Sequence, residues 1–284
     1  MGFSVNTNVS ALNTFRNLTN TQNSQSKSLE KLSSGLRINR AADDAAGLSI
    51  AEGLKAQVNG YSVAARNAQD GISVVQAAEG ALGESQSILQ RMRDLAVQAS
   101  SDTNNADART AIKSELDELA NELTRVVQST NFNGINLLTA AATDLTVQVG
   151  VEGAGSGNTI TIALAANDLE TIIGAGISAA GGGSSLTVAT AANGQAAIET
   201  IDTALKAVST ARSNFGATQN RLEYAISNIN VAAENLTSAE SRIRDVDMAK
   251  EMMNYSRTNI LSQAGTAMLA QANQSNAGVL QLLG

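Results

Sequence analysis

The side chains of this sequence that could do acid–base or cation chemistry are carboxylates, and they gather in two places. One is the pair Asp43 and Asp44, and the other is the run Glu115, Asp117 and Glu118. A catalytic or cation-binding carboxylate needs further functional groups beside it, and neither place adds a third type of ligand. We therefore expect these residues to form helix caps or solvated helix faces.

The residue types that are missing exclude most other chemistry. The sequence contains no His and no Cys, so the usual general base, the commonest transition-metal ligand and any thiolate or disulfide are absent. Neither a Gly-x-Gly-x-x-Gly run nor a Walker-type Gly-Lys-Ser/Thr run occurs, so a phosphate-binding loop is not indicated. We predict a protein that is not an enzyme and has no catalytic residues, cofactor or metal.

The composition also limits the partners. The formal net charge is −7, so nucleic acid is not an expected partner. No stretch of 18 uninterrupted apolar residues occurs, so membrane insertion is not expected either. The first residues lack the basic and apolar regions of a cleaved signal peptide.

The element that organises the chain is a long helix predicted over 198–243. Apolar residues recur at alternating steps of three and four for more than six heptads, which is typical of a helix packed in a left-handed coiled coil. Such a helix spans roughly 70 Å. The repeat includes three polar residues and these apolar ones: Ile198, Ile201, Leu205, Val208, Phe215, Leu222, Ile226, Ile229, Ala233, Leu236 and Ile243, with Arg212, Gln219 and Glu240.

Two more helices are predicted to pack along this one. A second long repeat begins at Ala51 and continues to about Ala99, interrupted by polar Glu79, Gln86 and Arg93. After a polar turn at 100–106, a shorter helix carries one apolar face and should double back as an αα-hairpin. That face comprises Ile112, Leu116, Leu119, Leu123 and Val126.

The apolar period then changes from 3.5 to 2. Leu145 to Val149 and Ile160 to Leu164 alternate apolar and polar residues on either side of a Gly-rich turn, which predicts a β-hairpin. The Asn133-Gly134 pair before it is a turn signal. After Asp168 the chain is rich in Gly and Ser, so we interpret 140–190 as a small hairpin region with a loop or appended element.

Both ends of the chain carry amphipathic helices with too little apolar surface to pair stably alone. The first is predicted over 3–38, with a mobile tail as the alternative interpretation. The second follows a phase shift of the repeat at Val246, which marks a break in packing partners. We expect Met248, Met252 and Met253 to fill the core of the terminal pair.

The two ends should therefore pair and still expose apolar seams that only other copies can cover. A surface that meets a different surface on the next copy generates a helical filament. The expected seam residues are Val5, Val9, Leu12, Leu29, Leu32, Leu36, Val246, Met253, Ile260, Met268, Leu280 and Leu283.

Several runs of residues resemble bacterial flagellins. They include 6–13, 32–48 and 65–72 near the beginning, and 235–239 and 263–274 near the end. The resemblance covers roughly 1–138 and 196–284. It implies a mainly α fold: a long antiparallel coiled-coil rod, a small β-hairpin region and paired N- and C-termini.

The resemblance also implies an architecture and a function. Residues 1–45 with 244–284 would form an inner terminal coiled-coil domain, and 46–243 a rod domain with the hairpin region at about 140–190. The chain would be secreted by type III export and polymerise into the extracellular flagellar filament that drives swimming. Implied partners are other copies of the chain, an export chaperone, and the filament cap and hook-associated proteins.

A further implied partner is animal Toll-like receptor 5. Gln90, Arg91, Leu95 and Glu115 stand where flagellins contact that receptor, and the same surface packs between subunits. Two other functions stay open: a hook–filament junction protein with similar ends, and a secreted helical effector or immune ligand. A catalytic insert is disfavoured because the middle segment lacks His and Cys.

Overall fold

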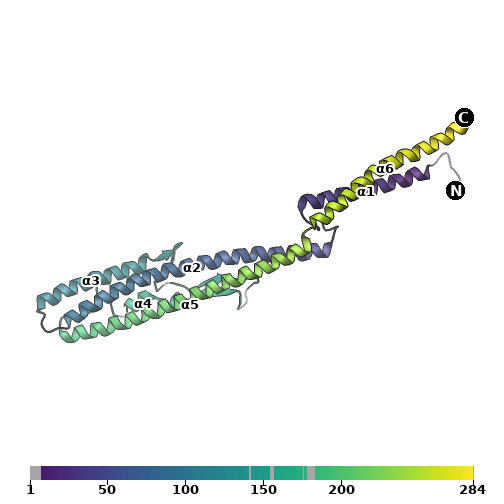
Figure 1. Cartoon of the computed structure of the whole chain (residues 1–284). Helices are drawn as coiled ribbons and strands as arrows, with labels where there is room; N and C mark the ends of the chain where they lie inside the picture. Colours follow the sequence, from purple (N-terminus) through teal and green to yellow (C-terminus); the bar gives the residue numbers. More distant parts are fainter. Residues whose placement is uncertain (1–7, 141, 154–156, 175, 178–182, 284) are drawn as a thin grey trace. The chain divides into compact units, whose positions relative to one another are not determined.

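The computed structural model describes residues 8–140, 142–153, 157–174, 176–177 and 183–283, with side chains except at 166 and 275–283. The chain divides into two compact units. One is formed by Met1–Val58 with Glu234–Gly284, and the other by Asn59–Ala233. The described residues are mainly helical, as predicted (Figure 1).

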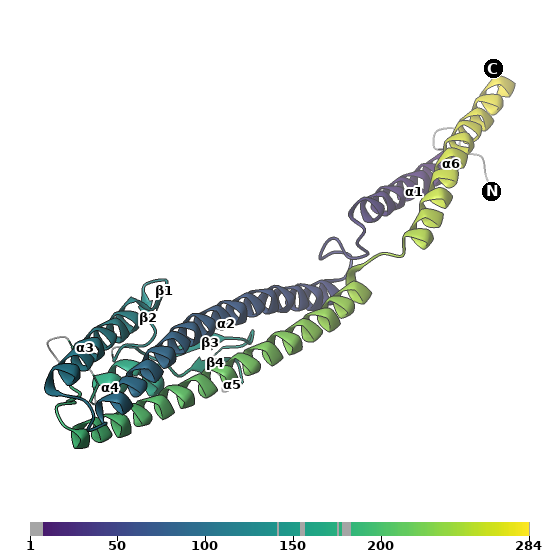
Figure 2. The same ribbon diagram turned by 60° about the vertical axis from the view of Figure 1, so that its left-hand side comes forward.

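The central unit is built on two long helices, α2 (Ala45–Ala99) and α5 (Ala191–Arg244), which run side by side (Figures 1 and 2). Their facing sides bury apolar residues at heptad spacing, as a coiled-coil seam requires. On α2 these are Ala68, Val75, Leu82, Leu89 and Ala96, and on α5 they are Ile201, Val208, Phe215, Leu222 and Ile229. The long helix predicted over 198–243 is therefore confirmed, and it begins seven residues earlier, at Ala191.

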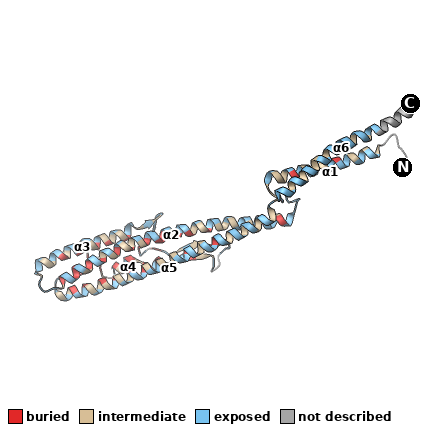
Figure 3. Cartoon of the chain, viewed as in Figure 1, coloured by how far each residue is buried: buried red, intermediate tan, exposed pale blue. Residues whose placement is uncertain are grey.

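Helix α3 (Ala106–Ser129) folds back beside α2, as predicted. Asn105 caps its N-terminus by accepting a hydrogen bond from the backbone N–H of Ala108 at 2.8 Å. Its buried face is Ile112, Leu116, Ala120, Leu123 and Val127. Buried residues of this unit lie along the facing sides of α2, α3 and α5 (Figure 3).

The segment between α3 and α5 contains two small hairpins. Strands β1 (Asn131–Phe132) and β2 (Ile135–Asn136) flank a turn in which Asn133 and Gly134 both have positive φ. Strands β3 (Leu145–Gln148) and β4 (Thr159–Ile162) pair antiparallel, which confirms the period-2 prediction. A Cβ added at Gly71 of α2 would lie 3.0 Å from Val147 of β3, so this hairpin packs closely on α2.

The rest of this segment contributes more to the core than a loop would. A 3₁₀ turn (Ala165–Asn167) leads into the short helix α4 (Leu169–Gly174). The apolar side chains of the segment between α3 and α5 are fully or almost fully buried: Leu137, Leu138, Leu164, Leu169, Ile173, Ile177, Leu186 and Val188. These residues are spaced irregularly between small and polar ones, so periodicity could not assign them to a buried face.

The terminal unit pairs helices α1 (Val9–Ser34) and α6 (Met248–Leu283) in antiparallel orientation. The Asn8 side chain donates to the carbonyl of Ala272 at one end, at 3.0 Å, and the N–H of Val246 donates to the carbonyl of Gly35 at the other, also at 3.0 Å. Pairing of the two ends was predicted.

The end of α1 differs from the prediction, which continued the helix to residue 38. The helix ends at Ser34 because Gly35 adopts a left-handed conformation, with φ of 73°, and donates its N–H to the carbonyl of Lys31. Glycine has little penalty for this conformation and commonly ends helices in this way. Leu36 then forms an isolated antiparallel bridge with Asp245, in the break between α5 and α6.

Candidate interaction surfaces

Both groups of carboxylates, Asp43 with Asp44 and the run from Glu115 to Glu118, have structural partners. The side chain of Asp43 accepts hydrogen bonds from the backbone N–H groups of Arg40 (3.1 Å) and Asn39 (3.2 Å), which lower its pKa. Asp44 accepts from the N–H of Gly47 at 2.9 Å, in the first turn of α2. Asp44 therefore caps the N-terminus of α2, as predicted, whereas Asp43 stabilises the turn that precedes this helix.

The second carboxylate group is also engaged. Burial alone would raise the pKa of Asp117, but hydrogen bonds from Lys113 and from the backbone N–H of Ser184 outweigh burial and lower that pKa. Across the described part of the chain, no group of acidic side chains is arranged to hold a metal ion. No helix within that part is long and apolar enough to span a bilayer.

The described seam residues of the terminal unit remain open to solvent. Six of them, Val9, Leu12, Leu29, Met253, Ile260 and Met268, have exposed fractions from 51% to 66%. Leu32, Leu36 and Val246 are intermediate. Val5 lies outside the described residues, as do the side chains of Leu280 and Leu283. The α1–α6 pair thus leaves apolar surface uncovered on both of its helices.

The expectation for the α6 methionines was wrong for the single chain. Met248, Met252 and Met253 are 48%, 51% and 63% exposed, so they do not fill a core between α1 and α6. A close contact between α1 and α6 is instead made where a large side chain meets a glycine. Leu18 packs against Gly265, where an added Cβ would lie 3.1 Å from the Leu18 Cδ1 atom.

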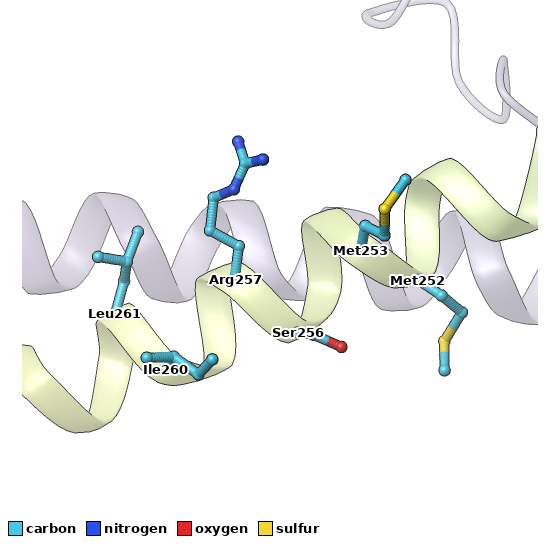
Figure 4. Close-up of a pocket in the computed structure, with 6 residues that line it drawn as sticks. All are labelled: Met252, Met253, Ser256, Arg257, Ile260 and Leu261. Carbon is cyan, nitrogen blue, oxygen red and sulfur yellow. The ribbon is translucent and has the colours of Figure 1, made fainter.

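A shallow apolar hollow of about 490 Å³ lies on α6 beside these methionines. Figure 4 shows the six side chains that line it, from Met252 to Leu261. A second hollow, of about 300 Å³, lies between α1 and α6 and shares Leu261 with the first. Leu18, Gly265 and Met268 also line the second hollow. The two hollows meet at Leu261 and together form the apolar strip of α6, which α1 borders with the polar side chains of Thr14, Asn17 and Thr21.

The four residues expected from the resemblance to contact a receptor divide between surface and core. Arg91 on α2 reaches Glu115 on α3, with its Nε and Nη2 atoms 3.0 and 2.6 Å from the Glu115 Oε1 atom. Gln90 is exposed beside this pair. Leu95 is only 3% exposed and packs in the core. Within one chain, Gln90, Arg91 and Glu115 share a surface, and Leu95 lies beneath it.

A junction that was not predicted joins the segment after α1 to the end of α5. Arg37 donates its backbone N–H to the carbonyl of Arg244 (2.6 Å), and its guanidinium donates to the carbonyl of Ile243. These carbonyls end α5 and have no partner within the helix, so a cation stabilises them. Arg244 in turn pairs with Glu52 at 2.9 Å. Only the basic character of Arg37, just after the helix-ending Gly35, could have indicated this role.

Comparison with known proteins assigns the chain to a family. The chain is 52% identical over 279 residues to the flagellin of Halalkalibacterium halodurans, covering 98% of this chain and 99% of that protein. The chain belongs to the bacterial flagellins. The flagellin N-terminal helical region matches residues 5–143, and the flagellin C-terminal helical region matches residues 198–283.

Other flagellins are similar over nearly the whole chain. The Bacillus subtilis flagellin is 43% identical over 303 residues, and the 33 kDa flagellar filament core protein of Treponema phagedenis is 44% identical over 292; both alignments cover 98% of this chain and 99% of the relative. The crystal structure of Bacillus cereus flagellin has a TM-score of 0.50 at 30% identity, covering 62% of this chain and 94% of that one.

Proposed function

We propose that this chain is the structural subunit of a bacterial flagellar filament and acts by polymerising outside the cell, without catalysis. The observation that carries the proposal is the α1–α6 pair, which leaves large apolar side chains exposed on both helices. A soluble chain rarely keeps such rows uncovered unless another molecule covers them. Membership of the flagellin family identifies that molecule as another copy of the chain.

The free energy gained by covering the exposed seam residues is consistent with assembly by many weak contacts. Complete burial of a large apolar side chain contributes about 1.5–3 kcal/mol, and the six exposed seam residues are already close to half covered. Covering the rest contributes roughly 5–10 kcal/mol, which is similar to the cost of about 4–15 kcal/mol for immobilising a subunit. A subunit should therefore add stably only where several neighbours cover both seams, and losing one seam should prevent assembly.

Truncation tests this proposal. Deleting residues 1–40 or 246–284 should leave a soluble central unit that cannot polymerise, because each deletion removes one helix of the exposed pair. Electron microscopy of seeded assemblies is the measurement. A point variant gives a sharper comparison: Ile260→Gln should raise the critical concentration for assembly, whereas Asn273→Gln at an exposed polar position of α6 should not. Normal filaments from either truncation would contradict the proposal.

The domain division is part of the same proposal. Residues 1–45 with 244–284 would form the inner domain that assembles, and 46–243 the rod domain. Support comes from the contrast between the two units: buried apolar residues concentrate between Asn59 and Ala233, while α1 contains only Leu18 and Ser28 as buried residues.

We also propose an export chaperone and the filament cap and hook-associated proteins as partners, on the family resemblance alone.

Toll-like receptor 5 is proposed as a host partner through Gln90, Arg91 and Glu115, with Leu95 shaping the surface from below. The Arg91 and Glu115 side chains are 58% and 44% exposed, so a receptor can reach both. Arg91→Ala should weaken activation of receptor-expressing reporter cells. Arg125→Ala on α3 is the matched control because Arg125 forms a similar exposed ion pair, with Glu122. Equal losses in the two variants would refute a contact at Arg91.

A further inference from the structure

The sulfur atoms of this chain are distributed unevenly. The sequence has no Cys and six Met, so methionine thioethers are its only sulfur groups. Met92 lies in the core of the central unit with no exposed surface. Four others, Met248, Met252, Met253 and Met268, all lie on α6, and each is 48% to 63% exposed. Met1 lies outside the described residues.

The exposed thioethers lie within the apolar strip of α6. Met252 and Met253 line the larger hollow together with Ile260 and Leu261, and both side chains extend from the helix in Figure 4. Met268 lines the second hollow, beside Leu18. Met248 precedes Met252 by four residues, so it lies on the same side of α6 one turn away. Any change in the polarity of these sulfur atoms therefore changes the surface proposed to carry assembly.

We propose that these four methionines are a modification site for two-electron oxidants such as hydrogen peroxide, and that oxidation removes the unassembled subunit from polymerisation. A sulfur lone pair attacks one peroxide oxygen, the S–O bond forms and the O–O bond breaks. The departing hydroxide takes up the proton of the hydroxyl group now bonded to sulfur, and it leaves as water. The thioether is oxidised by two electrons to the sulfoxide, and the peroxide is reduced by two.

The consequence depends on whether the subunit is free or assembled, and this step rests on the proposed function. A sulfoxide is polar, and burying it without a hydrogen-bond partner disfavours the buried state by roughly tenfold or more per group. Oxidised subunits should therefore fail to add to a filament. In an assembled filament the same side chains are covered by neighbours, so the oxidant should reach them slowly. The site thus acts on the subunit before assembly and spares the finished polymer.

The first experiment maps the reaction on the full-length chain. Unassembled protein is treated with hydrogen peroxide, and the sulfoxide at each methionine is measured by mass spectrometry of proteolytic peptides. The four α6 methionines should oxidise at least about tenfold faster than Met92, whose oxidation requires an opening of the core. Similar rates at Met92 and on α6 would overturn the site, whether or not the chain polymerises.

The second experiment measures the consequence by seeded light scattering. Peroxide treatment should raise the critical concentration about tenfold or more, and methionine sulfoxide reductases A and B with a thiol reductant should restore it. Met92→Leu should stay sensitive. A variant with leucine at the four α6 positions should resist peroxide, because Met→Leu nearly conserves volume.

Four outcomes separate the possible failures. Normal assembly by the oxidised chain, or no rescue by the reductases, would overturn the inference. If the α6 methionines oxidised as fast in filaments as in free subunits, the inference that assembly protects them would be overturned. Untreated wild-type chain that never assembles would instead refute the proposed filament function, and the oxidation map would still decide the modification site.

Discussion

The tip of the central unit offers a sharp test of packing, because α5 begins there against the end of α2. A Cβ added at Gly194 would lie 2.9 Å from both the Cα and the backbone N atoms of Ser100. Real Cβ atoms do not approach backbone so closely, and a backbone atom cannot rotate away as a side chain can. In the same helix, a Cβ added at Gly216 would meet nothing within 4 Å. The same substitution at these two positions should therefore have opposite effects.

The expected magnitudes follow from two opposing effects. Alanine in place of glycine favours a helix by about 0.5–1 kcal/mol, so Gly216→Ala should raise the free energy of unfolding by that amount. At Gly194 the same gain is offset by overpacking of about 1–3 kcal/mol, since α5 must move away from Ser100. The free energies of unfolding of the two variants should differ by about 1–3 kcal/mol. Their melting temperatures should differ by roughly 2–12 °C.

Urea and thermal unfolding followed by circular dichroism would give the global difference. Amide hydrogen exchange would localise it: Gly194→Ala should accelerate exchange in peptides covering 96–101 and 191–197, and Gly216→Ala should not. If the two variants had the same stability and the same exchange at the tip, the close approach of Gly194 to Ser100 would be wrong, and so would the packing of α5 on α2 there.

Three further predictions concern the core, its polar contacts and the turn before α2. Phe215→Ala should destabilise the central unit by about 3–5 kcal/mol in urea unfolding, because this side chain is 1% exposed; Phe215→Leu should lose much less. Arg212→Ala should lose about 1–2 kcal/mol in the same assay, since it removes the 2.7 Å hydrogen bond to Gln86 and the packing of the Arg stem. The folded-state pKa of Asp43 is lowered, chiefly by the N–H of Arg40. Its stabilisation should therefore be complete above its ordinary pKa of 3.8 and disappear as the pH falls through the lower folded value. Asp43→Asn should remove that part of the pH dependence of thermal unfolding.

Elements with a regular apolar period could be predicted from the sequence. The heptad from Ile201 to Ile229 identified α5, and the alternation from Leu145 to Val149 identified the second hairpin. Both patterns work because a helix or strand repeats its geometry, so the buried positions repeat as well. The change of phase at Val246 likewise located the break between α5 and α6.

Features that depend on one residue or on distant contacts could not be predicted in this way. Gly35 ends α1 through a single left-handed conformation, although apolar periodicity continues past it. Leu169 and Ile177 are fully buried, although no local period marks them. The prediction that Met253 is buried between α1 and α6 was wrong for a similar reason. An apolar side chain on an amphipathic helix indicates a partner, but it does not indicate whether that partner is in the same chain.

The terminal unit is discontinuous in sequence. Its first segment ends at Val58, its second begins at Glu234, and the entire central unit is inserted between them. Helix α1 therefore pairs with α6 only after the other end of the polypeptide reaches it. Ring-closure entropy grows only by about 0.6 kcal/mol for each doubling of the intervening length. The central unit could therefore become longer or shorter during evolution with little effect on the free energy of pairing α1 with α6.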